Sequence, residues 1–171
     1  MGRPGDTGYP IRSIVKDGLL FSVNFEPDRW PACNPETGYL DTDGSPTKTW
    51  LLESHRRNSA DPHWAFAFGK RGPEELYDLA ADPDCVHNLA GAADRRAVKT
   101  ALAEQLGKDL LAEGDLRVLG RGAEYEAQPY SEERWRGFYE KSKAGKLKPG
   151  WVNPGDFEEG GNTLPTRSRK E

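Results

Sequence analysis

The sequence predicts an α+β fold, in which one long helix packs a small antiparallel sheet and long loops join the elements. Two runs of β-forming residues are joined by Asp17-Gly18, a pair that tolerates the positive φ angles of a tight hairpin turn. Apolar residues recur at four-residue steps through residues 92–113, as on one face of a helix. The 171 residues include 19 glycines and 13 prolines, so turns and loops take up much of the chain.

Composition limits the size of the core and the classes of partner. Hydrophobic residues make up 35% of the chain, which predicts a modest core that a partner surface could complete. The net charge is −4, and acidic neighbours dilute the one concentrated basic stretch, so we expect no nucleic-acid partner. That stretch consists of Lys141, Lys143, Lys146 and Lys148. No apolar run approaches the roughly twenty residues of a membrane span, so we expect no membrane partner.

The predicted sheet begins with a hairpin. Residues 11–16 alternate imperfectly in polarity, and residues 19–25 are rich in β-forming side chains. A further strand is predicted over residues 74–79. The turn-prone sequence at 82–84 ends it, because proline lacks the N–H that a strand ladder needs.

Residues 26–46 are dense in proline, glycine, aspartate and asparagine, and they predict a long ordered loop. We expect Trp30 and Tyr39 to hold this loop against an apolar surface. Residues 47–57 fit a short helix with Thr47 as its N-cap. One side of that helix is formed by Trp50, Leu51 and Ser54. The aromatic-rich residues 63–68 fit either a helix or a strand.

The strongest helix is predicted over residues 92–113, with Asp94 as its cap and Gly114 as its C-terminal glycine. Its apolar stripe is Val98, Leu102, Leu106 and Leu110. A weaker helix is predicted over residues 132–143. The side chains expected to face inward from it are Trp135, Phe138 and Tyr139.

Several short strings of the sequence, taken in order, resemble one enzyme family. Residues 74–83 (EELYDLAADP) and 88–90 (NLA) resemble a segment near the C-terminus of many sulfatases. Residues 8–14 (GYPIRSI) are similar to the start of the C-terminal subdomain in the heparan N-sulfatase (sulfamidase) and arylsulfatase branch. Residues 24–32 (NFEPDRWPA) and 43–48 (DGSPTK) are similar to bacterial members of that branch. The resemblance covers residues 8–154.

The resemblance implies a sheet of about four antiparallel strands packed by a long helix. In the full enzyme this unit closes onto a large alkaline-phosphatase-like α/β domain. We therefore expect a short N-terminal leader over residues 1–8, the subdomain over 9–154 and a disordered tail over 155–171. The leader lacks the apolar core of a secretion signal, although members of the family are usually exported.

The resemblance also implies that the catalytic groups lie elsewhere. Sulfatases use a formylglycine made from the cysteine of a C-x-P-x-R motif, together with a calcium ion, and we expect both in a separate catalytic domain. Cys33 begins the string CNPET, which has threonine where that motif has arginine, and the resemblance places it in a loop. Residues 41–44 (DTDG) form only part of a calcium-loop pattern and fit a turn better. We expect no catalytic residue, metal ligand or cofactor in this chain.

Six cationic residues are candidates to contact an anionic sulfated sugar, because the family's C-terminal subdomain lies beside the substrate cleft. They are Arg29, Lys48, His55, Arg56, Lys70 and Arg71. The alternative for each is a solvated surface charge or an ion pair. Trp30 and Trp64 could stack on a sugar ring, but core packing or docking to the catalytic domain explains them better.

Two functions follow. The first is a C-terminal fragment of a sulfatase, a hydrolase of sulfuric esters or N-sulfates of sulfated sugars such as glycosaminoglycans. In that case the fragment supports the fold, shapes the cleft and partners the catalytic domain. The second is a standalone non-catalytic module that binds sulfated glycans.

Overall fold

The computed structural model describes residues 5, 7–31, 41–128, 132–148 and 150–156. Contacts divide the chain into two compact units. The sheet unit consists of Tyr9–Arg29 and Arg71–Gln128, and the helical unit consists of Met1–Gly8, Trp30–Lys70 and Pro129–Glu171. The segment expected to be one subdomain is therefore distributed over both units.

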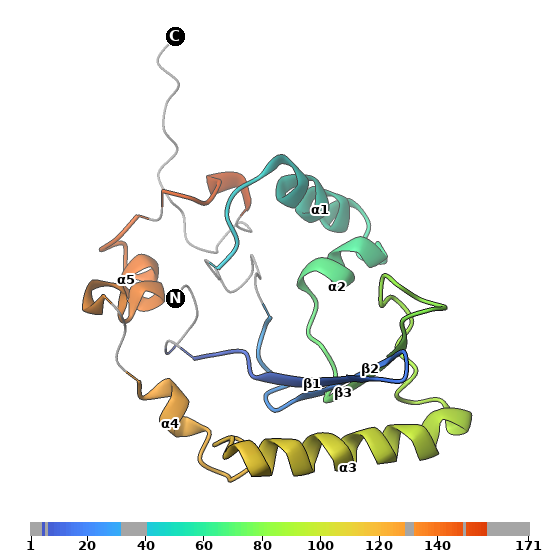
Figure 1. Cartoon of the computed structure of the whole chain (residues 1–171). Coiled ribbons are helices and arrows are strands. Elements are labelled where there is room, and N and C mark those ends of the chain that lie inside the picture. Colours follow the sequence, from blue (N-terminus) through green and yellow to red (C-terminus); the bar gives the residue numbers. More distant parts are fainter. Residues whose placement is uncertain (1–4, 6, 32–40, 129–131, 149, 157–171) are drawn as a thin grey trace. The chain divides into compact units, whose positions relative to one another are not determined.

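The sheet unit is built on a three-stranded antiparallel sheet in the order β1-β2-β3 (Figure 1). Its strands are β1 (Ile11–Lys16), β2 (Leu19–Asn24) and β3 (Glu74–Asp78). The φ angles of Asp17 and Gly18 are 51° and 75°, as a two-residue type I′ turn requires. The predicted hairpin is confirmed. The described residues hold three strands, where the resemblance implies about four.

The short 3-10 helix η2 (Ala93–Arg95) and the helix α3 (Arg96–Glu113) form a 21-residue helical segment packed against the sheet (Figure 1). Gly114 ends α3 with a φ of 72°, as the sequence predicts. The prediction that Asp94 caps the helix is wrong. Asp94 lies inside η2 rather than ahead of it, and no side chain caps η2 or α3.

One hydrophobic core holds the sheet to α3. Phe21 and Leu76 are opposite each other on β2 and β3, and both are 0% exposed. They pack with three leucines of α3, which confirms the predicted stripe: Leu102, Leu106 and Leu110. Burying a side chain of this size contributes about 1.5–3 kcal/mol to the free energy of folding. These five residues therefore form the main stabilising cluster of the sheet unit.

The helical unit begins with α1 (Pro46–Arg57) and α2 (Pro62–Phe68). The N-cap of α1 is Ser45, whose hydroxyl accepts the N–H of Lys48 at 3.1 Å. The prediction of Thr47 was wrong, because Pro46 starts the helix one residue earlier and lacks an N–H to be capped. Within α1, the buried hydrophobic residue is Leu52, whereas Trp50 is 51% exposed.

The helix predicted over residues 132–143 is broken in two. The 3-10 helix η3 (Glu133–Trp135) is followed by Arg136 in an extended conformation and by Gly137 at a φ of 64°. The helix α5 (Phe138–Lys143) starts after that glycine. The break arises because a left-handed residue cannot continue a right-handed helix.

Three further features complete the described residues. The short helix α4 (Ala123–Glu126) belongs to the sheet unit and was not predicted. The 3-10 helix η4 (Pro154–Asp156) lies partly where the sequence predicts the tail, and Asp156 is 2% exposed. None of the helices in the described part of the chain is long and apolar enough to cross a membrane.

Candidate functional site

The six cationic candidates are divided between the two units. Arg29 and Arg71 belong to the sheet unit. The helical unit contains Lys48, His55, Arg56 and Lys70. The contacts that these residues make within their own unit decide which charges remain available to a ligand.

Arg29 is held by carboxylates of its own unit. Its Nη1 donates to Oε1 of Glu126 at 2.5 Å, and its Nη2 lies 3.4 Å from Oε1 of Glu26. Arg117 contacts both of these glutamates, at 2.7 Å and 3.4 Å. The hydrogen bond from Arg29 is the main reason that the pKa of Glu126 lies below its ordinary value. Arg29 therefore joins the loop after β2 to α4.

Arg71 is also held by an ion pair. Its Nε and Nη2 both donate to the carboxylate of Glu75, at 2.8 Å and 2.6 Å. These hydrogen bonds raise the pKa of Arg71 above its ordinary value. Bidentate pairs of this kind are the strong form of an arginine–carboxylate contact. Arg71 therefore fixes the start of β3.

Lys48 and Arg56 both extend from α1 to the segment that contains η4. The Nζ of Lys48, which is 4% exposed, donates to the carbonyl of Thr42 at 2.8 Å and lies 3.7 Å from Oδ2 of Asp156. Arg56 donates to the carbonyls of Gly155 and Asp156, both at 2.9 Å. These two cations therefore hold η4 against α1.

The other two candidates, His55 and Lys70, share one aromatic cluster. The ring of His55 stacks on Trp64 with centroids 4.3 Å apart and planes 14° apart. Trp64 meets Trp30 edge to face at 6.0 Å, and the Nζ of Lys70 lies 5.3 Å from the centre of the Trp30 ring. Phe68 closes the cluster against Trp64 at 6.4 Å. Trp30 and Trp64, the two tryptophans that could stack on a sugar ring, thus pack against each other.

The chemistry available at this cluster is limited. The Nδ1 of His55 is buried and has no hydrogen-bond partner in the part of the chain that the structure describes. Lys70 is exposed and can meet an anion, but a lysine above an indole ring is a stabilising contact in its own right. Of the six candidates, His55 and Lys70 share this aromatic cluster, and Lys48 and Arg56 share the contact with η4.

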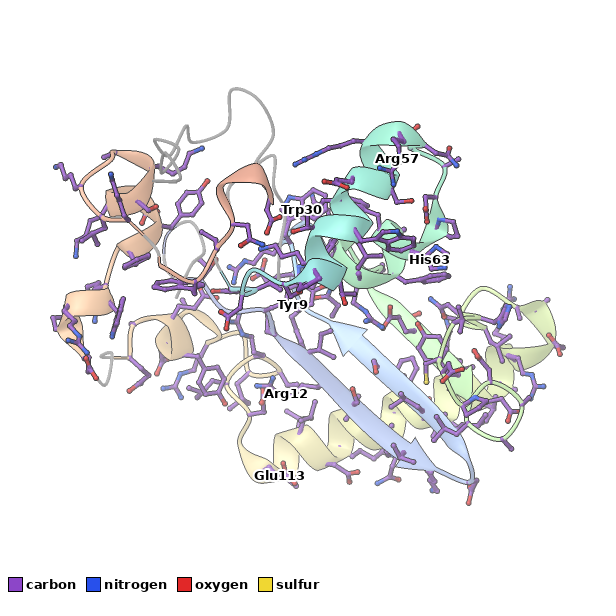
Figure 2. The ribbon with its side chains drawn as sticks, turned by 90° about the horizontal axis from the view of Figure 1, so that it is seen from above. Tyr9, Arg12, Trp30, Arg57, His63 and Glu113 are labelled. Carbon is purple, nitrogen blue, oxygen red and sulfur yellow. The ribbon has the colours of Figure 1, made fainter. Side chains whose placement is uncertain are left out.

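A second polar group, which the sequence reasoning did not single out, joins α1 to the start of α2. The carboxylate of Asp61 accepts the hydroxyl of Ser54 at 2.5 Å and contacts Nδ1 of His63 at 2.7 Å. It also accepts the N–H of His63 at 2.9 Å, and Figure 2 shows His63 on α2. The sequence signal was Asp61-Pro62, since aspartate before proline is typical of a helix start.

The pKa of Asp61 falls to about 2, first because of the Ser54 hydroxyl and then because of the N–H and ring of His63. This group is not a nucleophilic triad. The serine hydroxyl donates to the carboxylate and not to the imidazole, and a carboxylate whose pKa is lowered to about 2 is too weak a base to activate it. The arrangement orients the His63 ring and caps α2.

The sulfatase-type features lie partly outside the described residues. Cys33, with its CNPET string, and Tyr39 are among the residues that the structure does not describe. Cys85 carries a free thiol. In the calcium-like string at 41–44, the carbonyl of Thr42 is taken by Lys48 and the N–H of Gly44 by the carbonyl of Trp151. Among the described residues, no three histidine, cysteine, aspartate or glutamate side chains are grouped to hold a metal ion.

Compared with known proteins, the sequence matches no protein-family model and no curated protein.

Proposed function

We propose that this chain is the C-terminal subdomain of a sulfatase of the heparan N-sulfatase/arylsulfatase branch. In this role it supports the fold and shapes the substrate cleft. Formylglycine and calcium belong to a separate alkaline-phosphatase-like catalytic domain, which hydrolyses sulfuric esters or N-sulfates of sulfated sugars. The observation that carries the proposal is that the string at residues 74–90 folds as one hydrogen-bonded unit.

That unit is organised by Asn88. Its Oδ1 accepts the N–H of Leu76 at 3.0 Å and that of Ala90 at 2.9 Å, and its Nδ2 donates to the carbonyl of Glu74 at 3.1 Å. Leu89 adds a backbone hydrogen bond to the carbonyl of Leu76 at 2.8 Å. The NLA string thus lies along the outer edge of β3, where the side chain of Asn88 and the backbone of Leu89 hold it.

The two aspartates of the string also accept hydrogen bonds from backbone N–H groups. Asp78 accepts the N–H groups of Ala80 and Ala81, both at 3.2 Å. Asp82 accepts the N–H of Val86 at 3.1 Å and that of His87 at 2.7 Å. Asp78, Asp82 and Asn88 therefore satisfy backbone groups, so this part of the likeness falls on residues that determine local structure.

Residues 9–14 and 24–29 of the strings near the N-terminus lie in the same unit, whereas residues 30–32 and 43–48 belong to the helical unit. The Nδ2 of Asn24 donates to the hydroxyl of Tyr9 at 3.0 Å, and its Oδ1 accepts the N–H of Glu26 at 3.0 Å. Arg12 pairs with Asp115, with Nη2 and Oδ2 2.7 Å apart, beyond the C-terminal end of α3 where Figure 2 labels Glu113. Parts of the strings that carry the family resemblance are thus also connected by contacts in the structure. This supports the proposal that they belong to one structural unit.

The proposal also requires a surface for the catalytic domain. Both units expose large apolar side chains that a docking partner could cover. In the sheet unit these are Val15, Val86, Leu111, Leu119 and Tyr125, and in the helical unit they are Trp50 and Phe66.

The DNA upstream of the Met1 codon, read in all frames, tests the proposal. We expect it to encode a C-x-P-[SA]-R motif and an aspartate-rich metal site, in frame or one shift away. Co-expression of that segment with this chain should then yield hydrolysis of 4-nitrophenyl sulfate that neither part gives alone. Unrelated upstream sequence behind an intact promoter and ribosome site would overturn the proposal.

The alternative function, a standalone module that binds sulfated glycans without catalysis, would then take its place. It predicts measurable affinity of the isolated chain for sulfated oligosaccharides, and this affinity should fall with added salt because the contacts are ionic.

A further inference from the structure

A pocket in the helical unit combines aromatic walls with a cationic rim. It is formed by η3, α5 and the segment that follows, and the sequence assigned no binding role to it. A cavity of about 290 Å³ opens there. Its lining residues are Arg134, Trp135, Phe138, Leu147, Lys148 and Trp151.

Three aromatic rings form the walls. Phe138 is 4% exposed and belongs to the small core at the base of the pocket, and Trp135 and Trp151 are half-buried. Ring centres are 5.2 Å apart for Phe138 with either tryptophan and 6.1 Å apart for the two tryptophans. Trp135 ends η3 and Phe138 begins α5, so the two rings come from elements that Gly137 separates with a φ of 64°.

The angles between the rings favour a puckered ligand over a flat one. The planes of Trp135 and Trp151 are 71° apart, those of Trp135 and Phe138 are 50° apart, and those of Phe138 and Trp151 are 31° apart. No two rings are parallel, so a flat ligand cannot be held between two of them. Inclined rings form a concave apolar wall, which suits the C–H faces of a sugar.

The rim supplies positive charge. Arg134 lies 5.1 Å from the centre of the Trp135 ring and pairs with Glu132, which neutralises part of its charge. Lys148 is exposed and has no ion-pair partner among the described residues. An anion at this rim would therefore meet Lys148 first and could compete with Glu132 for Arg134.

We propose that this pocket binds a single sugar ring that carries an anionic group, such as a sulfate, phosphate or carboxylate. The ring packs on Trp151 and Trp135 above Phe138, and the anion contacts Lys148 and Arg134. The volume lies at the lower end of the range for small-molecule sites, about 300–1,000 Å³, so one ring fits and an oligosaccharide does not. The inference rests on the pocket and not on the proposed function, so either can fail alone.

NMR of the full chain tests it, because the five tryptophans supply separate indole N–H signals. Glucose 6-sulfate, glucose 6-phosphate, glucuronate and uncharged glucose are titrated in turn. We expect saturable shifts of the Trp135 and Trp151 signals with a Kd on the order of 1 mM for the best anionic sugar. The signals of Trp30, Trp50 and Trp64 should not move. Comparing the three anionic sugars identifies the preferred group.

Variants of the rim provide the second measurement. Lys148→Gln and Arg134→Gln change exposed side chains and should each weaken binding about 5- to 10-fold, as expected for a lost charge-assisted contact. Lys143→Gln removes an exposed charge of the same stretch that does not line the pocket, and it should leave the Kd unchanged.

Three results would overturn the inference. One is the lack of saturable shifts at Trp135 and Trp151 up to about 50 mM of every sugar. Another is equal binding of glucose and its charged derivatives, or equal binding by the rim variants and Lys143→Gln. The third is tighter binding of benzenesulfonate than of any sugar, which would assign the pocket to planar aromatic anions.

Discussion

The two units of the chain are stabilised by different kinds of contact. The sheet unit has one core of five aliphatic and aromatic residues contributed by β2, β3 and α3. The helical unit has two cores of two buried residues each, Leu52 with Phe68 and Phe138 with Val152, surrounded by tryptophans. It also buries the Lys48–Asp156 pair. The sheet unit thus has one large core with its ion pairs around it, and the helical unit has small cores of oriented rings and a buried ion pair.

This difference predicts how each unit responds to substitution. A large-to-small substitution in a hydrophobic core lowers the free energy of unfolding by an amount that grows with the volume of the cavity it leaves. A unit held by directional contacts should instead be sensitive at a few polar positions. Substitutions in the two units therefore test this contrast.

Phe21→Ala should destabilise the sheet unit by about 4 kcal/mol, because it leaves a cavity at a position that is 0% exposed. Urea unfolding followed by circular dichroism measures the loss. Val15→Ala is the matched control on the neighbouring strand, since Val15 is 64% exposed and its loss should cost less than about 0.5 kcal/mol. Equal effects of the two changes would mean that Phe21 is not part of a close-packed core.

The same contrast explains which elements could be predicted from the sequence. The hairpin and α3 were predicted correctly, because Asp17-Gly18 and the four-residue apolar step are local signals of sheet and helix. The break inside residues 132–143 was missed. Trp135 and Phe138 are three residues apart and fit a continuous helix equally well, so the backbone conformations of Arg136 and Gly137 separate the two structures.

Lys48→Met should destabilise the helical unit by about 3 kcal/mol, because it leaves the carboxylate of Asp156 buried without a counter-charge. The Oδ1 of Asp156 accepts the hydroxyl of Thr49 at 2.8 Å, but its Oδ2 has no hydrogen-bond partner in the described residues, so the negative charge would stay without a cation. Tryptophan fluorescence during urea unfolding measures the effect. Adding Asp156→Asn to Lys48→Met should recover part of the loss.

Lys143→Met is the control, because it removes an exposed lysine of α5 and should change the free energy of unfolding by less than about 0.5 kcal/mol. If Lys48→Met proved no more costly than Lys143→Met, the buried pair would contribute nothing, and aromatic contacts alone would hold the unit.

The candidate site was harder to predict than the fold. Positive residues can be read from the sequence, but their partners cannot, because these are distant in the chain. Arg29 and its partner Glu126 are 97 positions apart, and Arg56 donates to Gly155 from 99 positions away. Only folding decides which cations are taken up by internal contacts. Lys148, which lines the pocket, was visible in the sequence only as part of a basic stretch.

The smallest expected effect concerns two aspartates, one in each unit, that each contact a histidine. Asp61 has its pKa lowered to about 2, mainly by the Ser54 hydroxyl, whereas the pKa of Asp82 is lowered mainly by the backbone N–H of His87. Ser54→Ala should therefore raise the pKa of Asp61 toward its ordinary value of 3.8 and leave that of Asp82 unchanged. NMR titration of the two carboxyl carbons measures both values.

The sign of the pH dependence follows from the direction of the shift. A carboxyl whose pKa is depressed by folding stabilises the folded state fully above its ordinary pKa, and this contribution is lost as the pH falls through the lowered value. The contribution of Asp61 should therefore decline between pH values of about 4 and 2. In Ser54→Ala this decline in stability should be smaller, because folding then lowers the pKa of Asp61 by less. An unchanged Asp61 pKa in Ser54→Ala would instead assign the shift to His63, and the contact between α1 and α2 would then not depend on the hydroxyl.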